Sequence, residues 1–165
     1  MTEQLWAPWR LEYIKSADED PGCVFCGAFD GDDEEKLVVH RGTQAFVLLN
    51  KFPYASGHFM VAPVRHTGDF GTLDDDELVE IHRLASSGIG ALSQLYAPQA
   101  YNLGWNLGRV AGAGVVDHVH LHVVPRWAGD TNFMPVVGET RVISEGLDES
   151  YRTVRDAFSK VSPGR

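Results

Sequence analysis

Short apolar runs separated by turn-forming residues occupy the first half of the chain. They span residues 37–40, 45–49 and 58–64. Runs of this length between turn signals are typical of β-strands. The first two are joined by Arg41-Gly42-Thr43-Gln44, and the second and third by residues 51–57, which include proline and glycine. The pattern predicts a hairpin followed by a third strand.

The apolar positions then recur at steps of three and four residues, which predicts an amphipathic helix over about residues 74–96. Its stripe consists of Leu78, Ile81, Ala85, Ile89, Leu92 and Leu95. Thr72 and Asp75 have the spacing of a capping box. Gly88 and Gly90 weaken the helix without ending it. A second stripe predicts a terminal helix through Leu147, Tyr151, Val154, Phe158 and Val161.

Two more strand candidates, residues 101–107 and 117–127, flank a segment with three glycines, residues 108–114. In a strand at 117–127 three histidines share one face, because alternate side chains point the same way. These are His118, His120 and His122, and the opposite face carries Val119, Leu121 and Val123. Strands, a long helix and strands again predict an α+β fold, an antiparallel sheet with helices on one side.

Composition narrows the class of protein. The chain has 165 residues, 44% of them hydrophobic and 22% charged, which fits one globular domain. Its net charge of -9 argues against nucleic acid as a partner, since phosphate backbones are bound through clustered Lys and Arg. No apolar run approaches the roughly 20 residues of a membrane-spanning helix, and the first residues do not resemble a signal peptide. We therefore expect a cytoplasmic protein.

The aromatic arm at residues 5–14 is expected to pack on the body or on a partner subunit.

The histidine face predicts nucleophilic chemistry. A neutral imidazole can attack phosphorus or an acyl carbon, and neighbouring imidazoles can neutralise charge and assist the leaving group. The glycine segment directly upstream offers backbone N–H groups to phosphate oxygens. Three histidines at alternate positions could instead hold a catalytic metal. That alternative leaves the glycine segment unexplained.

Cys23 and Cys26 form a Cys-x-x-Cys pair, and they are the two cysteines of the chain. A disulfide is disfavoured in a reducing compartment, and the βαβ pattern of a thioredoxin-like motif is missing. Half of a tetrahedral zinc site is the favoured interpretation. Two further ligands are then needed, and histidine is the first candidate.

The stretch His118-Val119-His120-Leu121-His122-Val123-Val124 resembles the signature of the histidine triad (HIT) superfamily of nucleotidyl hydrolases and transferases. The likeness extends to Cys23-Val24-Phe25-Cys26, to residues 45–50 followed by Pro53, to Gly57-His58, to Pro63 and to Asn106-x-Gly108. It implies a single HIT domain. In this fold about five antiparallel strands accompany one long helix and a C-terminal helix. The domain would comprise an arm and loop at 1–22, a core at 23–127 and an extension at 128–165.

The resemblance also implies a role for each member of the triad. His120 would be the nucleophile and would form a covalent nucleotidyl-histidine on the α-phosphorus. His122 would bind the scissile phosphate or assist the leaving group. His118 would instead join Cys23, Cys26 and His66 around a structural Zn²⁺, as in bacterial members with the Cys-x-x-Cys pair.

Further residues would bind the nucleotide. Asn50 would contact the ribose, and His58 would lie on the phosphate side or serve the structure alone. Asn106 would hold phosphates, together with Gly112, Ala113 and Gly114. Phe25 and Phe46 would wall the base or simply belong to the core.

One position departs from the pattern of the hydrolases. They usually carry glutamine four residues before the first triad histidine, where this chain has Gly114. The space left could admit inorganic phosphate as the second nucleophile. Residues 5–13 and 125–133 resemble the bacterial branch of diadenosine tetraphosphate phosphorylases, also called ATP adenylyltransferases.

This branch implies adenine nucleotides or dinucleoside polyphosphates as partners. A hydrolase or phosphoramidase that releases AMP, and a nucleotide-binding protein without catalysis, remain alternatives. The resemblance further implies a homodimer through the long helix and the sheet edge, and the arm could extend it to a tetramer.

Overall fold

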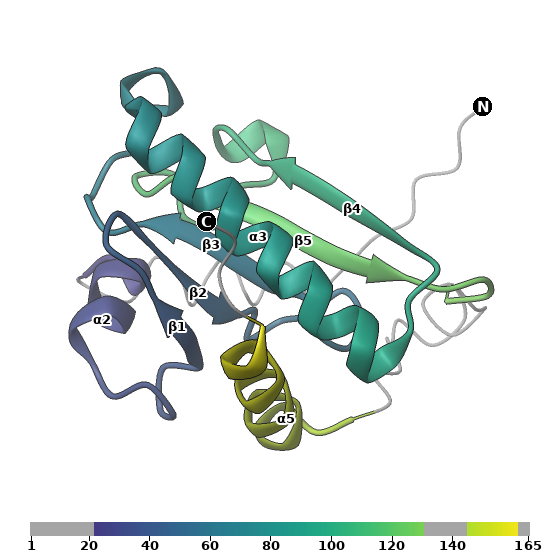
Figure 1. Cartoon of the computed structure of the whole chain (residues 1–165). Helices are drawn as coiled ribbons and strands as arrows, with labels where there is room; N and C mark the ends of the chain where they lie inside the picture. The colour runs from purple at the N-terminus through teal and green to yellow at the C-terminus, as the bar shows by residue number, and fades with distance from the viewer. Residues whose placement is uncertain (1–21, 131–144, 162–165) are drawn as a thin grey trace, which may run out of the picture.

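A computed structural model describes residues 22–130 and 145–161 (Figure 1). The aromatic arm and most of the segment between Trp127 and the terminal helix lie outside the described residues. The helices are α2 (Val24–Asp30), α3 (Asp75–Tyr96) and α5 (Leu147–Lys160), and two 3-10 turns cover Phe70–Thr72 and Arg109–Ala111. The strands are β1 (Val38–Arg41), β2 (Ala45–Leu49), β3 (Phe59–Pro63), β4 (Ala100–Trp105) and β5 (Leu121–Arg126).

All five strands belong to one sheet in the order β1-β2-β3-β5-β4, and every pairing is antiparallel. The α+β fold with a long helix and a C-terminal helix is therefore confirmed. α3 crosses one face of the sheet, and α5 packs beside it against β1 (Figure 1). Within the described residues, no helix is both long and apolar enough to cross a membrane.

The expectation that helices cover one side of the sheet is incomplete. Alternate residues of β2 belong to two buried clusters, Val47 and Leu49 to that of α3, and Phe46 and Leu48 to that of α2. Both faces of this strand are covered, so all five of its residues are buried. α2 was not predicted, and it brings Phe25 onto the second face.

α3 begins two residues later than the predicted capping box. The N-cap is Asp74, whose carboxylate accepts a hydrogen bond from the N–H of Glu77, while the Glu77 carboxylate accepts one from the N–H of Asp74. Thr72 instead closes the 3-10 turn that precedes the helix. The buried face of α3 contains Ile81, Leu84, Ala85, Ala91 and Leu92.

The predicted histidine strand is only partly paired. β5 begins at Leu121, and the extended residues before it bond elsewhere: the N–H of Val119 donates to the carbonyl of Thr67 at 2.8 Å. The predicted alternation nevertheless holds. Val119, Leu121 and Val123 lie in the core beneath α3, and the three histidines are thereby directed to the opposite side.

Candidate active site and metal centre

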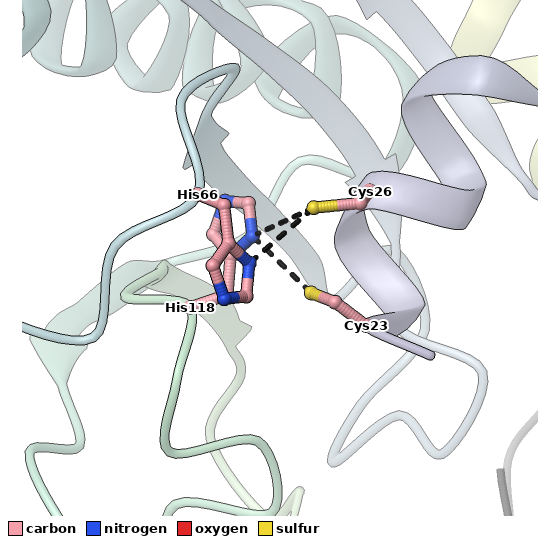
Figure 2. A group of neighbouring side chains, drawn as sticks. All are labelled: Cys23, Cys26, His66 and His118. Atoms are coloured by element: carbon pink, nitrogen blue, oxygen red, sulfur yellow. Dashed lines mark hydrogen bonds between the residues drawn. The ribbon is translucent and has the colours of Figure 1, made fainter. Parts of the chain in front are cut away.

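Four side chains from three separate segments meet beside the N-terminal end of α2 (Figure 2). They are Cys23, Cys26, His66 and His118, and their ligand atoms all lie within 4.8 Å of one another. Cys23 is the N-cap of α2 and Cys26 follows within its first turn. Cys23 Sγ lies 3.3 Å from His118 Nδ1, and Cys26 Sγ lies 3.4 Å from His66 Nδ1. The four predicted ligands are thus brought together.

The donor set fits a zinc ion. Tetrahedral zinc, with Zn–S near 2.3 Å and Zn–N near 2.0 Å, holds sulfur and nitrogen about 3.5 Å apart. His118 is fully buried, and its Nε2–H donates to the carbonyl of Pro63 at 2.8 Å. A neutral ring then carries its lone pair on Nδ1, which faces both sulfurs. Burial raises the pKa of the Cys26 thiol, and the Cys23 sulfur raises it further. A divalent cation bound by the two sulfurs would instead lower the pKa of the thiol.

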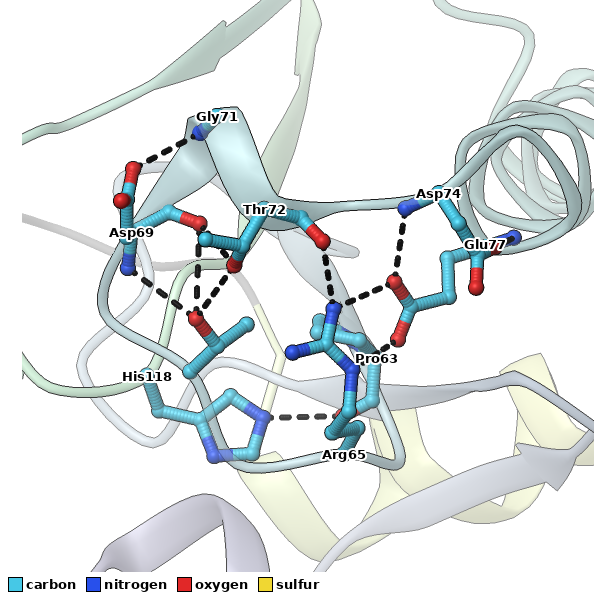
Figure 3. A network of polar contacts seen from close by, with 9 residues as sticks. Pro63, Arg65, Asp69, Gly71, Thr72, Asp74, Glu77 and His118 are labelled. Atoms are coloured by element: carbon cyan, nitrogen blue, oxygen red, sulfur yellow. Dashed lines mark hydrogen bonds and ion pairs between the residues drawn. The ribbon is translucent and has the colours of Figure 1, made fainter.

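Two arginines anchor the segments that carry these ligands. Arg41 donates to the carbonyls of Phe29, Ala28 and Gly31, and so caps the C-terminal end of α2. Arg65, next to His66, is bidentate on Glu77 at 2.9 and 2.7 Å (Figure 3). This pairing lowers the pKa of Glu77, which is 2% exposed, and ties the loop after β3 to the start of α3.

His120 is oriented by the backbone of the preceding histidine. Its Nδ1–H donates to the carbonyl of His118 at 2.8 Å, because a carbonyl can only accept. The lone pair of the neutral ring therefore resides on Nε2. Burial lowers the pKa of His120, so the ring is neutral at pH 7. A neutral imidazole with a defined lone pair is the form that a nucleophile requires.

His122 has the opposite arrangement of nitrogens. His58 Nδ1 accepts from the N–H of Tyr54 at 3.1 Å, so the proton of His58 is on Nε2, which lies 3.1 Å from His122 Nδ1. His122 Nδ1 thus accepts, and its own proton is on Nε2. The side-chain nitrogen of Asn106 lies 3.5 Å from Nε2 but can only donate, so the amide oxygen would have to take its place to accept this proton. Burial, followed by the charge of His120, lowers the pKa of His122 to about 4. The triad places a lone pair and an N–H donor on neighbouring rings, with centroids 4.8 Å apart.

Asn50 and the two phenylalanines occupy positions that packing also explains. Asn50 Oδ1 accepts from the N–H of Phe52, and its Nδ2 lies 3.5 Å from His58 Nδ1. Phe46 is fully buried, 5.3 Å from the ring of Phe29. Phe25 is 2% exposed and lies against His120. Contacts with ribose and base stay predictions for these residues.

The glycine segment differs from its expected form. Gly108 and Gly112 have positive φ values of 84° and 95°, which glycine tolerates best. Within the loop, the N–H of Ala111 and that of Ala113 donate to the carbonyl of Gly108, and that of Gly112 donates to Arg109. These three amides are engaged in the turn itself, so the expectation of unobstructed N–H groups does not hold for them. The role of residues 112–114 in phosphate binding stays a prediction.

Tyr54 lies beside two of these histidines, and the sequence did not single it out as a residue of the site. Its ring centroid lies 4.7 Å from that of His58 and 6.2 Å from that of His122. The only sequence signal for Tyr54 was its place in the loop that ends at Gly57-His58.

A cavity of about 210 Å³ opens between the loop at residues 51–57 and α5, lined by residues that include Asn50 and Glu145. His58, which bonds to His122, also lines this cavity, whereas the triad histidines do not.

Two buried histidines and a half-buried one lie on one side of a five-stranded sheet, beside a Cys-His cluster, and this arrangement defines the class of protein. The chain belongs to the HIT domain family, whose model matches residues 32–129. It is 34% identical to the AP-4-A phosphorylase of Mycobacterium tuberculosis (strain ATCC 25618 / H37Rv) over 166 residues, which cover 96% of this chain and 85% of that protein. It is also 30% identical to the adenosine 5'-monophosphoramidase HNT1 of Candida albicans over 109 residues, 63% of this chain and 70% of that protein.

A solved structure shares the fold. A Zn-bound histidine triad family protein from Mycobacterium smegmatis superposes with a TM-score of 0.66 and 25% sequence identity. The match covers 84% of this chain and 94% of that one. The resemblance read from the triad motif is thus confirmed.

Proposed function

We propose that the protein is a diadenosine tetraphosphate phosphorylase that works through a covalent adenylyl-histidine. The observation that carries the proposal is the orientation of His120, whose Nδ1–H is engaged by the His118 carbonyl. The substrate is suggested by the 34% identity with the AP-4-A phosphorylase along nearly the whole chain.

In the first step, Nε2 of His120 attacks the α-phosphorus of the dinucleotide. A P–N bond forms, the bond to the bridging oxygen breaks, and ATP leaves. The Nε2–H of His122 donates to a phosphate oxygen or to the departing oxygen, and so offsets the charge that develops. In the second step an oxygen of inorganic phosphate attacks the adenylyl group. ADP leaves and His120 is restored.

The second nucleophile, phosphate or water, distinguishes a phosphorylase from a hydrolase or phosphoramidase. Gly114 lacks the side-chain amide that hydrolases usually place there, and its absence leaves room for phosphate. The likeness to the adenosine 5'-monophosphoramidase supports the other alternative, in which water is the second nucleophile and AMP is the product. The substrate phosphates would be held by Asn106 and by residues 112–114, where the amides of Gly112 and Ala113 would have to release their hydrogen bonds within the turn.

Incubation with diadenosine tetraphosphate, with and without phosphate, tests the proposal. We expect ATP and ADP when phosphate is present, and one equivalent of ATP with adenylylated enzyme when it is absent. His120→Ala should abolish turnover and retain nucleotide binding, whereas His82→Ala, on an exposed part of α3, should leave activity unchanged. AMP as the product in phosphate buffer would replace the phosphorylase by a hydrolase. Binding without turnover in the wild type would leave a nucleotide-binding protein.

We further propose that the Cys-His cluster holds a structural Zn²⁺. All four positions of a tetrahedral ion would be filled by protein, so the metal would organise the fold and offer no open site for chemistry. Metal analysis should find about one zinc per chain, and less in Cys26→Ser. A ratio near zero in the wild type, purified without chelator, would contradict the proposal. Reduced thiolates are also consistent with a cytoplasmic location.

A homodimer is the expected assembly. β4 lies at the edge of the sheet, and four of its six residues are exposed, among them Leu103 at 47%. An exposed edge strand is a template for pairing with a second copy. Sedimentation should give twice the mass of 18.2 kDa, or four times for a tetramer. The mass of one chain would contradict this expectation.

A further inference from the structure

We propose that Phe25 is a positioning residue that fixes the ring of His120 and ties its orientation to the metal centre. The inference rests on the proposed role of His120 as nucleophile. It assigns Phe25 a different role from that of a wall for the base.

Phe25 lies between the two cysteines in α2 and touches two of the triad rings. Its ring centroid is 4.5 Å from that of His120, at an interplanar angle of 31°, and 5.1 Å from that of His118. Phe25 and His120 are 2% and 6% exposed, so neither ring can turn away without displacing packed neighbours. Phe25 therefore blocks movement of the His120 ring on one side.

The hydrogen bond from His120 Nδ1 to the His118 carbonyl does not fix the ring alone. A single hydrogen bond holds one edge of the imidazole, while the ring plane can still tilt about that contact. The direction of the Nε2 lone pair depends on this tilt. A misplacement of about 1 Å can cost on the order of a hundredfold in rate, because the reacting atoms must be aligned. The Phe25 ring supplies the second constraint.

α2 transmits the geometry of the metal centre to this contact. A seven-residue helix is too short to persist unaided. Arg41 holds its C-terminal end, and the Cys-His cluster holds the end that carries Phe25. An ion bound by both cysteines would fix the Phe25 ring, and the same ion would hold His118, whose carbonyl orients His120. Two contacts from one centre thus converge on the nucleophile.

Phe25→Leu tests the proposal, with Phe29→Leu as the matched control. Phe29 is on the same helix, but its ring packs on Phe46 and beneath the Arg41 guanidinium. Both variants are compared with the wild type by thermal unfolding, so that later measurements use folded protein. The first readout is the ¹⁵N spectrum of the His120 ring in substrate-free, zinc-loaded protein at fixed pH. The second is the single-turnover rate of ATP release, compared with the Kd of AMP.

Phe25→Leu should shift or broaden the His120 ring signals and slow ATP release about tenfold or more. Its Kd for AMP should stay within about threefold, since little of the buried ring can reach a base. Phe29→Leu should change neither. Removing zinc from the wild type with a chelator should move the same His120 signals, and removing it from Phe25→Leu should move them less.

Two results would overturn the proposal. Unchanged His120 signals in folded Phe25→Leu would show that Phe25 does not orient the ring. A raised Kd for AMP with an unchanged rate of ATP release would make Phe25 part of the base site. Failure of the wild type to cleave the dinucleotide would refute the proposed function, and the ring signals would still decide the role of Phe25.

Discussion

Gly88 and Gly90 lie two residues apart in α3, yet alanine should change stability in opposite directions at the two positions. A Cβ atom on Gly88 would lie 2.3 Å from Cζ of Phe59 and 2.9 Å from both of its Cε atoms. Phe59 is fully buried in β3, so its ring has no space into which to move. A Cβ atom on Gly90 would meet Cγ1 of Val161 at 3.6 Å, an ordinary van der Waals contact.

The magnitudes follow from helix propensity and packing. Gly→Ala within a helix stabilises by roughly 0.5–1 kcal/mol, which is the expected gain for Gly90→Ala. Overpacking a core costs about 1–3 kcal/mol, and three contacts under 3.0 Å put Gly88→Ala at the upper end. After the propensity gain, Gly88→Ala should be about 2 kcal/mol less stable than the wild type.

Urea unfolding of the zinc-loaded proteins measures the difference, through midpoints compared at a common slope. In a chain of this length, each kcal/mol also moves the melting temperature by roughly 2–4 °C. If Gly88→Ala unfolds at the same urea concentration as Gly90→Ala, or at a higher one, the reasoning on the approach of α3 to Phe59 is refuted.

Three further predictions concern charged and titrating groups. Glu77→Gln removes the negative charge that pairs with Arg65 and should lower the free energy of unfolding by about 2 kcal/mol. The control Glu35→Gln, at a side chain that is 71% exposed, should change the free energy of unfolding by less than about 0.5 kcal/mol. Arg41→Met removes the cap of α2 and should lower zinc affinity about tenfold in competition with a chromophoric chelator, and an unchanged affinity would show that the cap does not organise the cysteines. The pKa of His122 is about 4 in the folded protein against an ordinary 6.5, so between these values the unfolded chain binds a proton that the folded protein does not. Stability should therefore fall as the pH drops from 6.5 towards 4, and His122→Asn should make the urea midpoint less dependent on pH there; an equally steep dependence would argue against the lowered pKa.

Local periodicity explains what could be predicted from the sequence. The alternation of histidines with Val119 and Leu121 depends on backbone geometry alone, and so does the stripe of α3. The ends of strands depend on neighbouring strands. β5 begins at Leu121, opposite Val61 of β3 and opposite Trp105, where β4 ends; before it, the N–H of Val119 bonds instead to the carbonyl of Thr67, beyond the end of β3.

Contacts between distant residues explain what could not be predicted. α2 has no side-chain N-cap bond, and its conformation depends on buried Phe25 and on a cap donated by Arg41. The protonated nitrogen of His118 and that of His120 are each set by a backbone carbonyl. For His118 that group is the carbonyl of Pro63, 55 residues away. Spacing along the sequence identified the two cysteines and the triad, and the resemblance to the HIT superfamily implied His66 and His118 as further ligands, but neither carried information on these partners.

The pleat of the segment before β5 also restricts how the site can change. His118 belongs to the Cys-His cluster, His120 and His122 follow it at two-residue steps, and apolar residues anchor the segment between them. Deleting one residue here would exchange the imidazoles with the valines and leucine of the core, because side chains alternate with a period of two. We therefore expect the fold to tolerate insertions and deletions in the loop before His118, at a cost to phosphate binding, and to reject them between His118 and Val123. In this segment the spacing is as much a part of the active site as the imidazoles themselves.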